Sequence, residues 1–137
     1  MSAIEFRHDR KQIILPVAIL PPDASQMRLV RTEGLLDTGA SLCGLDAATI
    51  RALDLPRAGK ITLSTPVGAH VARSYRCRIG FYVDTNAAMP HVMEQEFLAI
   101  ESHPGDRFST LVGMNVLGSG ALYISSNGSG TFTFKTG

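Results

Sequence analysis

Apolar residues occur along the chain in short runs that are rich in β-branched and aromatic side chains and are separated by Gly, Pro, Asn and Asp. Such runs between turn-forming residues are typical of strands rather than of long helices. The pattern predicts strands at residues 12–20, 27–36, 61–65, 70–83, 96–100, 121–125 and 131–135.

One segment, residues 46–53, has a helical pattern instead. Asp46 can cap the first turn of a helix with its side chain. The apolar residues that follow, Ala47, Ile50 and Leu53, recur at the spacing of one helix face. A short helix is therefore predicted here.

Residues 113–118 can form one further turn of helix between their two glycines. Polar stretches at residues 21–26, 84–90 and 125–130 are predicted to be loops, and the last of them is a tight hairpin connection. No internal repeat appears in this order of elements. The whole pattern predicts an all-β fold with one or two short helices.

Length and composition agree with a single folded domain over residues 1–137. The chain has 45% apolar and 18% charged residues, so it can bury a core and lacks the composition of a disordered chain. Thirteen basic and twelve acidic residues give a net charge of +1, which provides no field to hold nucleic acid or an acidic membrane. No apolar run reaches membrane-spanning length and no signal-type stretch follows the N-terminus, so we expect a cytoplasmic protein without nucleic-acid or membrane partners.

Cysteine and histidine residues give no indication of a metal site or a cofactor. Cys43 and Cys77 lack C-x-x-C spacing, and two reduced thiols are expected. The histidines form no H-E-x-x-H motif or close pair, and we expect surface positions for His8, His70, His91 and His103.

A carboxylate directly follows an apolar run in the sequence GLLDTGAS, residues 34–41. A carboxylate at such a place is expensive to bury, which indicates that the fold needs it there. Gly39 lets the backbone approach Asp37 closely, so that neighbouring N–H groups can point at the carboxylate. Thr38 supplies a hydroxyl that can lock the loop against a partner. The D-[ST]-G triplet alone is a weak signal, and the flanking residues decide its meaning.

Three features together resemble the retropepsin-like aspartic proteases, which include retroviral proteases and bacterial and eukaryotic relatives. The first is an apolar strand that ends in LLDTGAS and precedes the helix at Asp46. The second is the downstream sequence TLVGMNVL, residues 110–117, which is similar to the apolar-apolar-Gly motif that packs beneath the family's catalytic loop and opens a short helix. The third is a Gly-containing hairpin at residues 65–69, where the family has its flap. The resemblance covers residues 27–134.

The resemblance implies a closed, barrel-like acid-protease fold and aspartic endopeptidase activity on a peptide or protein substrate, without a cofactor or a metal. It implies a catalytic site made of Asp37, Thr38 and Gly39. Two groups of residues are then expected to contact substrate: Ala40 and Ser41 in the catalytic loop, and Val67, Gly68 and Ala69 in the flap.

The sequence departs from the viral pattern at linked positions. Many retroviral enzymes have two acids after D-T-G-A and an Arg after the downstream Gly, and these form a supporting pair within the subunit. Here the positions hold Ser41, Leu42 and Met114. A different support for the loop is therefore expected, and the substrate preference of the viral enzymes does not transfer.

A chain of this length with one Asp-Thr-Gly motif implies that two chains together form the catalytic site. The chemistry uses two carboxylates that share a proton, of which one activates water and the other polarises the scissile carbonyl. Two-fold pairing would bring Asp37 against its symmetry mate and meet this requirement. We therefore expect a homodimer in which exposed edges of the strands at residues 12–20 and 131–135 interleave between subunits, as termini do in the family.

Other interpretations of these residues carry less weight. Asp37 as a turn aspartate would leave the downstream Gly motif unexplained. No G-x-S-x-G motif surrounds Ser41 or Cys43, so nucleophilic catalysis is not indicated. Arg76 and Arg78 share one face of a predicted strand and are expected to face solvent. The alternative from another class is a non-catalytic dimeric module that binds peptides or holds partners together, although a scaffold has no use for two carboxylates forced together.

Overall fold

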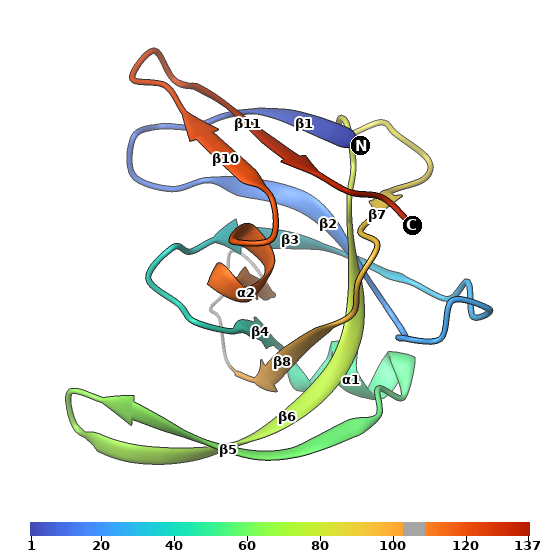
Figure 1. The fold of residues 1–137 in the computed structure, drawn as a ribbon, viewed down its shortest axis with the longest axis vertical. Coiled ribbons are helices and arrows are strands. Elements are labelled where there is room, and N and C mark those ends of the chain that lie inside the picture. The colour runs from blue at the N-terminus through green and yellow to red at the C-terminus, as the bar shows by residue number, and fades with distance from the viewer. Residues whose placement is uncertain (103–108) are drawn as a thin grey trace.

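The computed structural model describes residues 1–102 and 109–137 and consists mainly of strands (Figure 1). No helix in this part of the chain is long and apolar enough to cross a membrane. The elements, in chain order, are β1 Ser2–Arg7, β2 Ile14–Leu20, β3 Val30–Leu36, β4 Cys43–Leu45, α1 Ala47–Leu53, β5 Arg57–Thr65, β6 Gly68–Phe81, β7 His91–Val92, β8 Phe97–Glu101, β9 Thr110–Val112, α2 Met114–Leu117, β10 Ala121–Ile124 and β11 Ser129–Phe134.

A closed ring of strands forms the body of the molecule. Its order is β2–β3–β9–β4–β8–β6, and β6 pairs with β2 to complete the ring. Strand β2 is buried on both faces, because Leu15, Val17 and Ile19 lie in the main core whereas Ala18 and Leu20 lie in a second, smaller cluster. Burial on both faces explains its almost continuous apolar sequence ILPVAIL. The predicted barrel-like, all-β fold is therefore confirmed.

The long strand β6 connects three parts of the molecule. Its first residues pair with β5, its middle with β8 and its last residues with β2. The β5–β6 hairpin turns at Pro66 and Val67 and extends away from the barrel as a two-stranded arm, seen at the bottom of Figure 1. This arm is the hairpin that the sequence placed at residues 65–69.

A second sheet, ordered β1–β11–β10, lies beside the barrel (Figure 1). Along β11, buried and partly exposed residues alternate, as expected for a strand with one face on the core. Phe132 and Phe134 on the buried face lie with their ring centroids 5.3 Å from the ring of Phe81, which ends β6. These aromatic contacts join the small sheet to the barrel in one hydrophobic core.

All seven strands that the sequence predicted are present, with ends shifted by a few residues, and both short helices form. Asp46 caps α1, because its Oδ1 accepts a 3.1 Å hydrogen bond from the backbone N–H of Thr49. The strands β1, β4, β7 and β9 were not predicted as separate elements. Strands β4 and β9 have three residues each and β7 has two, which is too short to give a periodic signal.

The expectation of exposed edges on the strands at residues 12–20 and 131–135 is wrong. Strand β2 has β3 and β6 on its two sides, and β11 has β1 and β10 on its two sides. Their backbone groups are therefore used within the chain and cannot interleave with a second subunit. In the described part of the chain, β1 and β10 form the outer edges of the smaller sheet.

The two arginines on β6 behave differently from each other. Arg76 is exposed, as predicted, and lies 3.5 Å from Glu96. Arg78 is partly buried and donates hydrogen bonds of 2.7–3.2 Å to three backbone carbonyls of the loop at residues 21–26. The prediction that Arg78 faces solvent is wrong, because its guanidinium satisfies carbonyl groups of a loop that has no strand partner for them.

Candidate active site

Asp37 directly follows β3 at the point where the strand ends. Its backbone N–H donates a 2.9 Å hydrogen bond to the carbonyl of Val112, which continues the parallel β3–β9 ladder. The N–H of Leu36 donates a bond of the same length to the carbonyl of Ile13. The barrel therefore fixes the backbone as far as Asp37, while the side chain of Asp37 stays partly exposed.

The next residues turn back toward the carboxylate. The N–H of Gly39 donates a 2.9 Å hydrogen bond to Oδ1 of Asp37, and the N–H of Ala40 donates to the carbonyl of Asp37 at 3.2 Å. A Cβ atom at position 39 would lie 3.2 Å from the same Oδ1, so a side chain would crowd the carboxylate. The absence of a side chain at Gly39 thus permits the contact that orients Asp37.

Helix α2 supports the loop from the other side. The backbone N–H groups of Met114 and Asn115 donate hydrogen bonds of 2.7 and 3.1 Å to the carbonyls of Ala40 and Ser41. At Gly113, which precedes the helix, a Cβ atom would collide with the carbonyl of Leu42. The TLVG sequence therefore both pairs with β3 and lets α2 approach the loop closely.

The side chain of Asn115 on α2 joins β4 to β8 beneath the loop. It donates a 2.8 Å hydrogen bond to the carbonyl of Leu98 and accepts one of 3.3 Å from the thiol of Cys43. Burial raises the pKa of the Cys43 thiol to about 12, so the thiol keeps the proton that it donates. Sequence reasoning missed Asn115, although a polar residue in the otherwise apolar segment TLVGMNVL is a usable signal.

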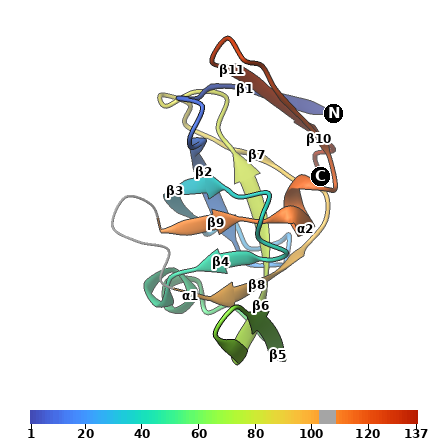
Figure 2. The ribbon, with the colours of Figure 1, turned by 90° about the vertical axis from the view of Figure 1, so that its left-hand side faces the viewer.

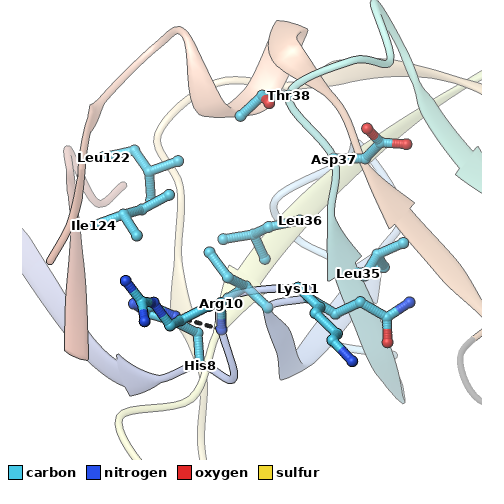
Figure 3. A pocket seen from close by; sticks show the side chains of 11 residues that line it. His8, Arg10, Lys11, Leu35, Leu36, Asp37, Thr38, Leu122 and Ile124 are labelled. Atoms are coloured by element: carbon cyan, nitrogen blue, oxygen red, sulfur yellow. Dashed lines mark hydrogen bonds between the residues drawn. The ribbon is translucent and has the colours of Figure 1, made fainter. Parts of the chain in front are cut away.

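A cavity of about 370 Å³ lies beside Asp37 (Figure 3). Asp37 and Thr38 form one side of it, and Leu122 and Ile124 of β10 form another. Its remaining lining comes from Leu35, Leu36 and the segment between β1 and β2: His8, Arg10, Lys11, Gln12 and Ile13. Sequence reasoning missed this last segment because it contains no motif and lies far from residue 37 in the chain.

The segment between β1 and β2 is held by its own hydrogen bonds. Oδ1 of Asp9 accepts from the N–H groups of Lys11 and Gln12, at 2.9 and 2.8 Å. These two bonds, from Gln12 first and then Lys11, hold the pKa of Asp9 below its usual value. His8, which is partly buried, accepts at Nδ1 from the N–H of Arg10 at 3.0 Å and donates from Nε2 to the carbonyl of Ser125 at 2.7 Å.

The predicted flap residues Val67, Gly68 and Ala69 lie at the tip of the β5–β6 arm and do not line the cavity beside Asp37. Val67 is 98% exposed, and Gly68 has a φ of 123°, a conformation that favours glycine. Three parts of the molecule project toward the same side, which is the left of Figure 1 and the front of Figure 2. They are the β5–β6 arm, the β3–β4 loop with Asp37 and the β1–β2 segment.

The histidine and cysteine residues do not form a cluster in the described part of the chain. Among the described residues, no three His, Cys, Asp or Glu side chains lie close enough together to hold a metal ion. His70 and His91 are exposed, whereas His103 lies outside the described residues. Cys43 and Cys77 are both buried and unpaired.

Solved structures that are similar to this fold include two proteases. The crystal structure of a retropepsin-like aspartic protease from Rickettsia conorii matches with a TM-score of 0.59 and 15% identity, over 97% of this chain and 91% of the other. The solution structure of Simian foamy virus (mac) protease matches with a TM-score of 0.50 and 14% identity, over 77% and 91%.

No protein-family model matches the sequence, and no curated protein matches it. The similarity at these identities establishes the retropepsin-like fold, which the sequence motifs had predicted.

Proposed function

We propose that the chain is one subunit of a homodimeric aspartic endopeptidase. In this proposal, a water molecule between Asp37 and the Asp37 of a second subunit attacks the peptide carbonyl. One carboxylate takes a proton from the water, and the other, protonated, polarises the carbonyl oxygen. The observation that carries the proposal is the placement of Asp37, a partly exposed carboxylate at a strand end, oriented by the N–H of Gly39 on a retropepsin-like fold.

The surrounding residues receive roles that follow from their positions. Gly39 holds the carboxylate, and the exposed side chain of Thr38 is available to reach the loop of a second subunit. Ala40 and Ser41 continue the loop and would contact the substrate backbone. Val67, Gly68 and Ala69 form the tip of an arm that would close over the substrate.

We further propose the outer edge of β10 as the surface on which two subunits meet. This edge is unpaired in the described part of the chain. It carries Tyr123 and Ile124, whose side chains are 66% and 49% exposed. Because Ile124 also lines the cavity beside Asp37, a second chain on this edge would bring its own catalytic loop close to the first.

The function is tested by hydrolysis of an unfolded protein such as reduced casein, with and without a statine-type inhibitor. Wild-type protein should cleave and the inhibitor should stop cleavage. Asp37→Asn should stay a folded dimer but lose at least about a hundredfold in rate, because the amide keeps the shape but cannot share a proton. Inhibitor binding without any hydrolysis by the wild type would instead support the non-catalytic peptide-binding module.

A further inference from the structure

We infer that residues 8–12, the segment between β1 and β2, form a subsite that selects substrates with an acidic side chain near the scissile bond. The inference rests on the proposed peptidase function and adds a substrate class to it. Arg10 and Lys11 line the same cavity as Asp37, on the side opposite Thr38 (Figure 3). A peptide lying over Asp37 would therefore pass close to two cationic side chains.

The subsite is preorganised. The carboxylate of Asp9 is engaged by backbone N–H groups two and three residues later, and His8 joins the segment to the β10–β11 hairpin through the carbonyl of Ser125. A second bond joins these elements, because the N–H of His8 donates to the carbonyl of Gly128 at 2.9 Å. The cations at positions 10 and 11 are thus presented without a rearrangement of the segment on binding, which favours affinity.

Arg10 has an unusual backbone conformation, with a φ of 69°. A residue with a side chain is uncommon there, and glycine would adopt the conformation without steric cost. Asp54, the other such residue in the described part of the chain, caps the end of α1, where this conformation is common. Arg10 caps no helix. A long cationic side chain at a strained position indicates that the side chain itself is used.

The charges near Arg10 and Lys11 leave them available for a ligand. Within the described residues, the ion pair that forms is Arg76 with Glu96, and neither Arg10 nor Lys11 forms one. The nearest carboxylate, that of Asp9, accepts the backbone N–H of Lys11, and its charge attracts that of Lys11. A catalytic pair that shares one proton carries a single negative charge. Two subunits would bring two copies of Arg10, Lys11 and Asp9 to the cleft. The four positive charges then outnumber the two of Asp9 and the one of the catalytic pair, so the net charge is positive and complementary to acidic peptides.

The size of the cavity limits how far the acidic residue of the substrate can lie from the scissile bond. A compact volume of about 370 Å³ is about 7 Å across, which is the length of about two residues of extended peptide. The acid is therefore expected within about two residues of the scissile bond. Ile13, Leu122 and Ile124 line the cavity as well, so apolar neighbours of the acid are favoured.

The test measures peptide binding to full-length Asp37→Asn protein, so that cleavage does not interfere. Labelled peptides with an apolar central pair carry either Glu or Gln at single positions up to three residues from the centre. Fluorescence anisotropy is recorded at 50 mM and 500 mM salt. At one position or more, the Glu peptide should bind about tenfold more tightly than its Gln partner at low salt, and the preference should shrink at high salt.

Variants assign the preference to the subsite. Arg10→Gly and Lys11→Gln should each reduce it, and Arg10→Lys should retain most of it. Arg10→Gly should reduce the preference for Glu without loss of stability, because glycine removes the backbone strain. Arg51→Gln, which removes an exposed cation on α1 outside the cavity, is the matched control and should change nothing.

The inference would be overturned if the Glu and Gln peptides bound equally at every position tested. It would also be overturned if Arg51→Gln reduced the preference for Glu as much as Arg10→Gly and Lys11→Gln do. Cleavage by the wild type without an acidic preference would leave the peptidase proposal standing and remove the subsite. A Glu preference in a protein whose wild type cleaves no peptide would keep the subsite and refute the peptidase. Absence of binding by any peptide would refute both.

Discussion

The backbone N–H of Met114 donates a 2.7 Å hydrogen bond to the carbonyl of Ala40, and this bond joins the two motifs that lie more than seventy residues apart in the sequence. It is possible because Gly113 lets α2 approach the backbone of Leu42. The neighbouring side chain of Asn115 then ties β4 to β8 beneath the loop. The position of Asp37 therefore depends on residues that never touch its carboxylate.

Asn115→Ala should lower the free energy of unfolding by about 1–3 kcal/mol, because it leaves the carbonyl of Leu98 and the thiol of Cys43 without their partner. Urea unfolding measures this loss. Turnover at a temperature where the variant is folded should also fall, since the loop is less well positioned. Asn86→Ala, at an exposed loop residue, is the control and should change stability by less than about 0.5 kcal/mol. Equal effects of the two variants would contradict the role given to Asn115.

The buried thiols predict a loss of stability at alkaline pH. Burial raises the pKa of Cys43 from an ordinary value of 9.0 to about 12, and burial also raises the pKa of Cys77. Above pH 9 the unfolded chain loses these protons while the folded chain keeps them, so the stability present below pH 9 is lost as pH rises. The free energy of unfolding should fall by about 1.4 kcal/mol per pH unit for each thiol.

Urea unfolding under reducing conditions between pH 8 and pH 10.5 measures this slope. The comparison is with a Cys43→Ala, Cys77→Ala double variant, in which the other titrating groups are unchanged. The double variant is less stable at pH 8 because two buried side chains are shortened, but its slope should be shallower. Identical slopes would show that the thiols are not protected from ionisation in the folded protein.

Gly68→Val should lower turnover and leave assembly intact, if the arm closes over substrate and its tip needs a left-handed backbone conformation. The matched control is Gly59→Val. Gly59 also has a positive φ, 109°, and an added Cβ would meet no atom within 4 Å at either glycine. Both variants therefore carry a similar backbone strain, but position 59 lies at the base of the arm in β5. Equal kcat/KM for the two variants would remove Gly68 from the proposed flap tip.

Local patterns in the sequence were sufficient to predict seven of the strands, the two helices and the place of Asp37 after a strand. The Asp46 cap and the two glycines around α2 act through neighbours in the chain, so their effects can be predicted without a structure. The pairing of Val17 with Phe81, which closes the barrel, joins segments sixty-four residues apart and leaves no local signal. The same limit explains why the interleaved strand edges were predicted wrongly.

The cavity beside Asp37 shows most clearly that contacts between distant segments cannot be predicted from local sequence patterns. Arg10 and Leu122 become neighbours of the loop that carries Asp37 only because β1 and β10 both pair with β11. Asp9 shapes the segment before β2, but nothing in the sequence distinguishes it from the other acidic residues. The place of Asp37 at the end of a strand could therefore be predicted from a motif, whereas its surroundings required the fold.

The proposed shared site makes a mutant subunit inactivate its partner, because each subunit supplies one carboxylate and neither can carry out the reaction alone. Wild-type and Asp37→Ala chains are unfolded together in equal amounts and refolded. Random pairing leaves roughly a quarter of the dimers with two wild-type chains, so activity per total dimer should fall to about that fraction.

Independent sites in single chains would retain about half of the activity instead. Slow exchange or selective pairing would also retain half, so co-assembly is verified with a size tag on one chain and by native mass spectrometry. A second control refolds the two proteins separately and mixes them afterwards, which should preserve half until subunits exchange. Half of the activity in a sample with proven mixed dimers would refute the shared pair of carboxylates, because a chain with one Asp-Thr-Gly motif would then be catalytically complete by itself.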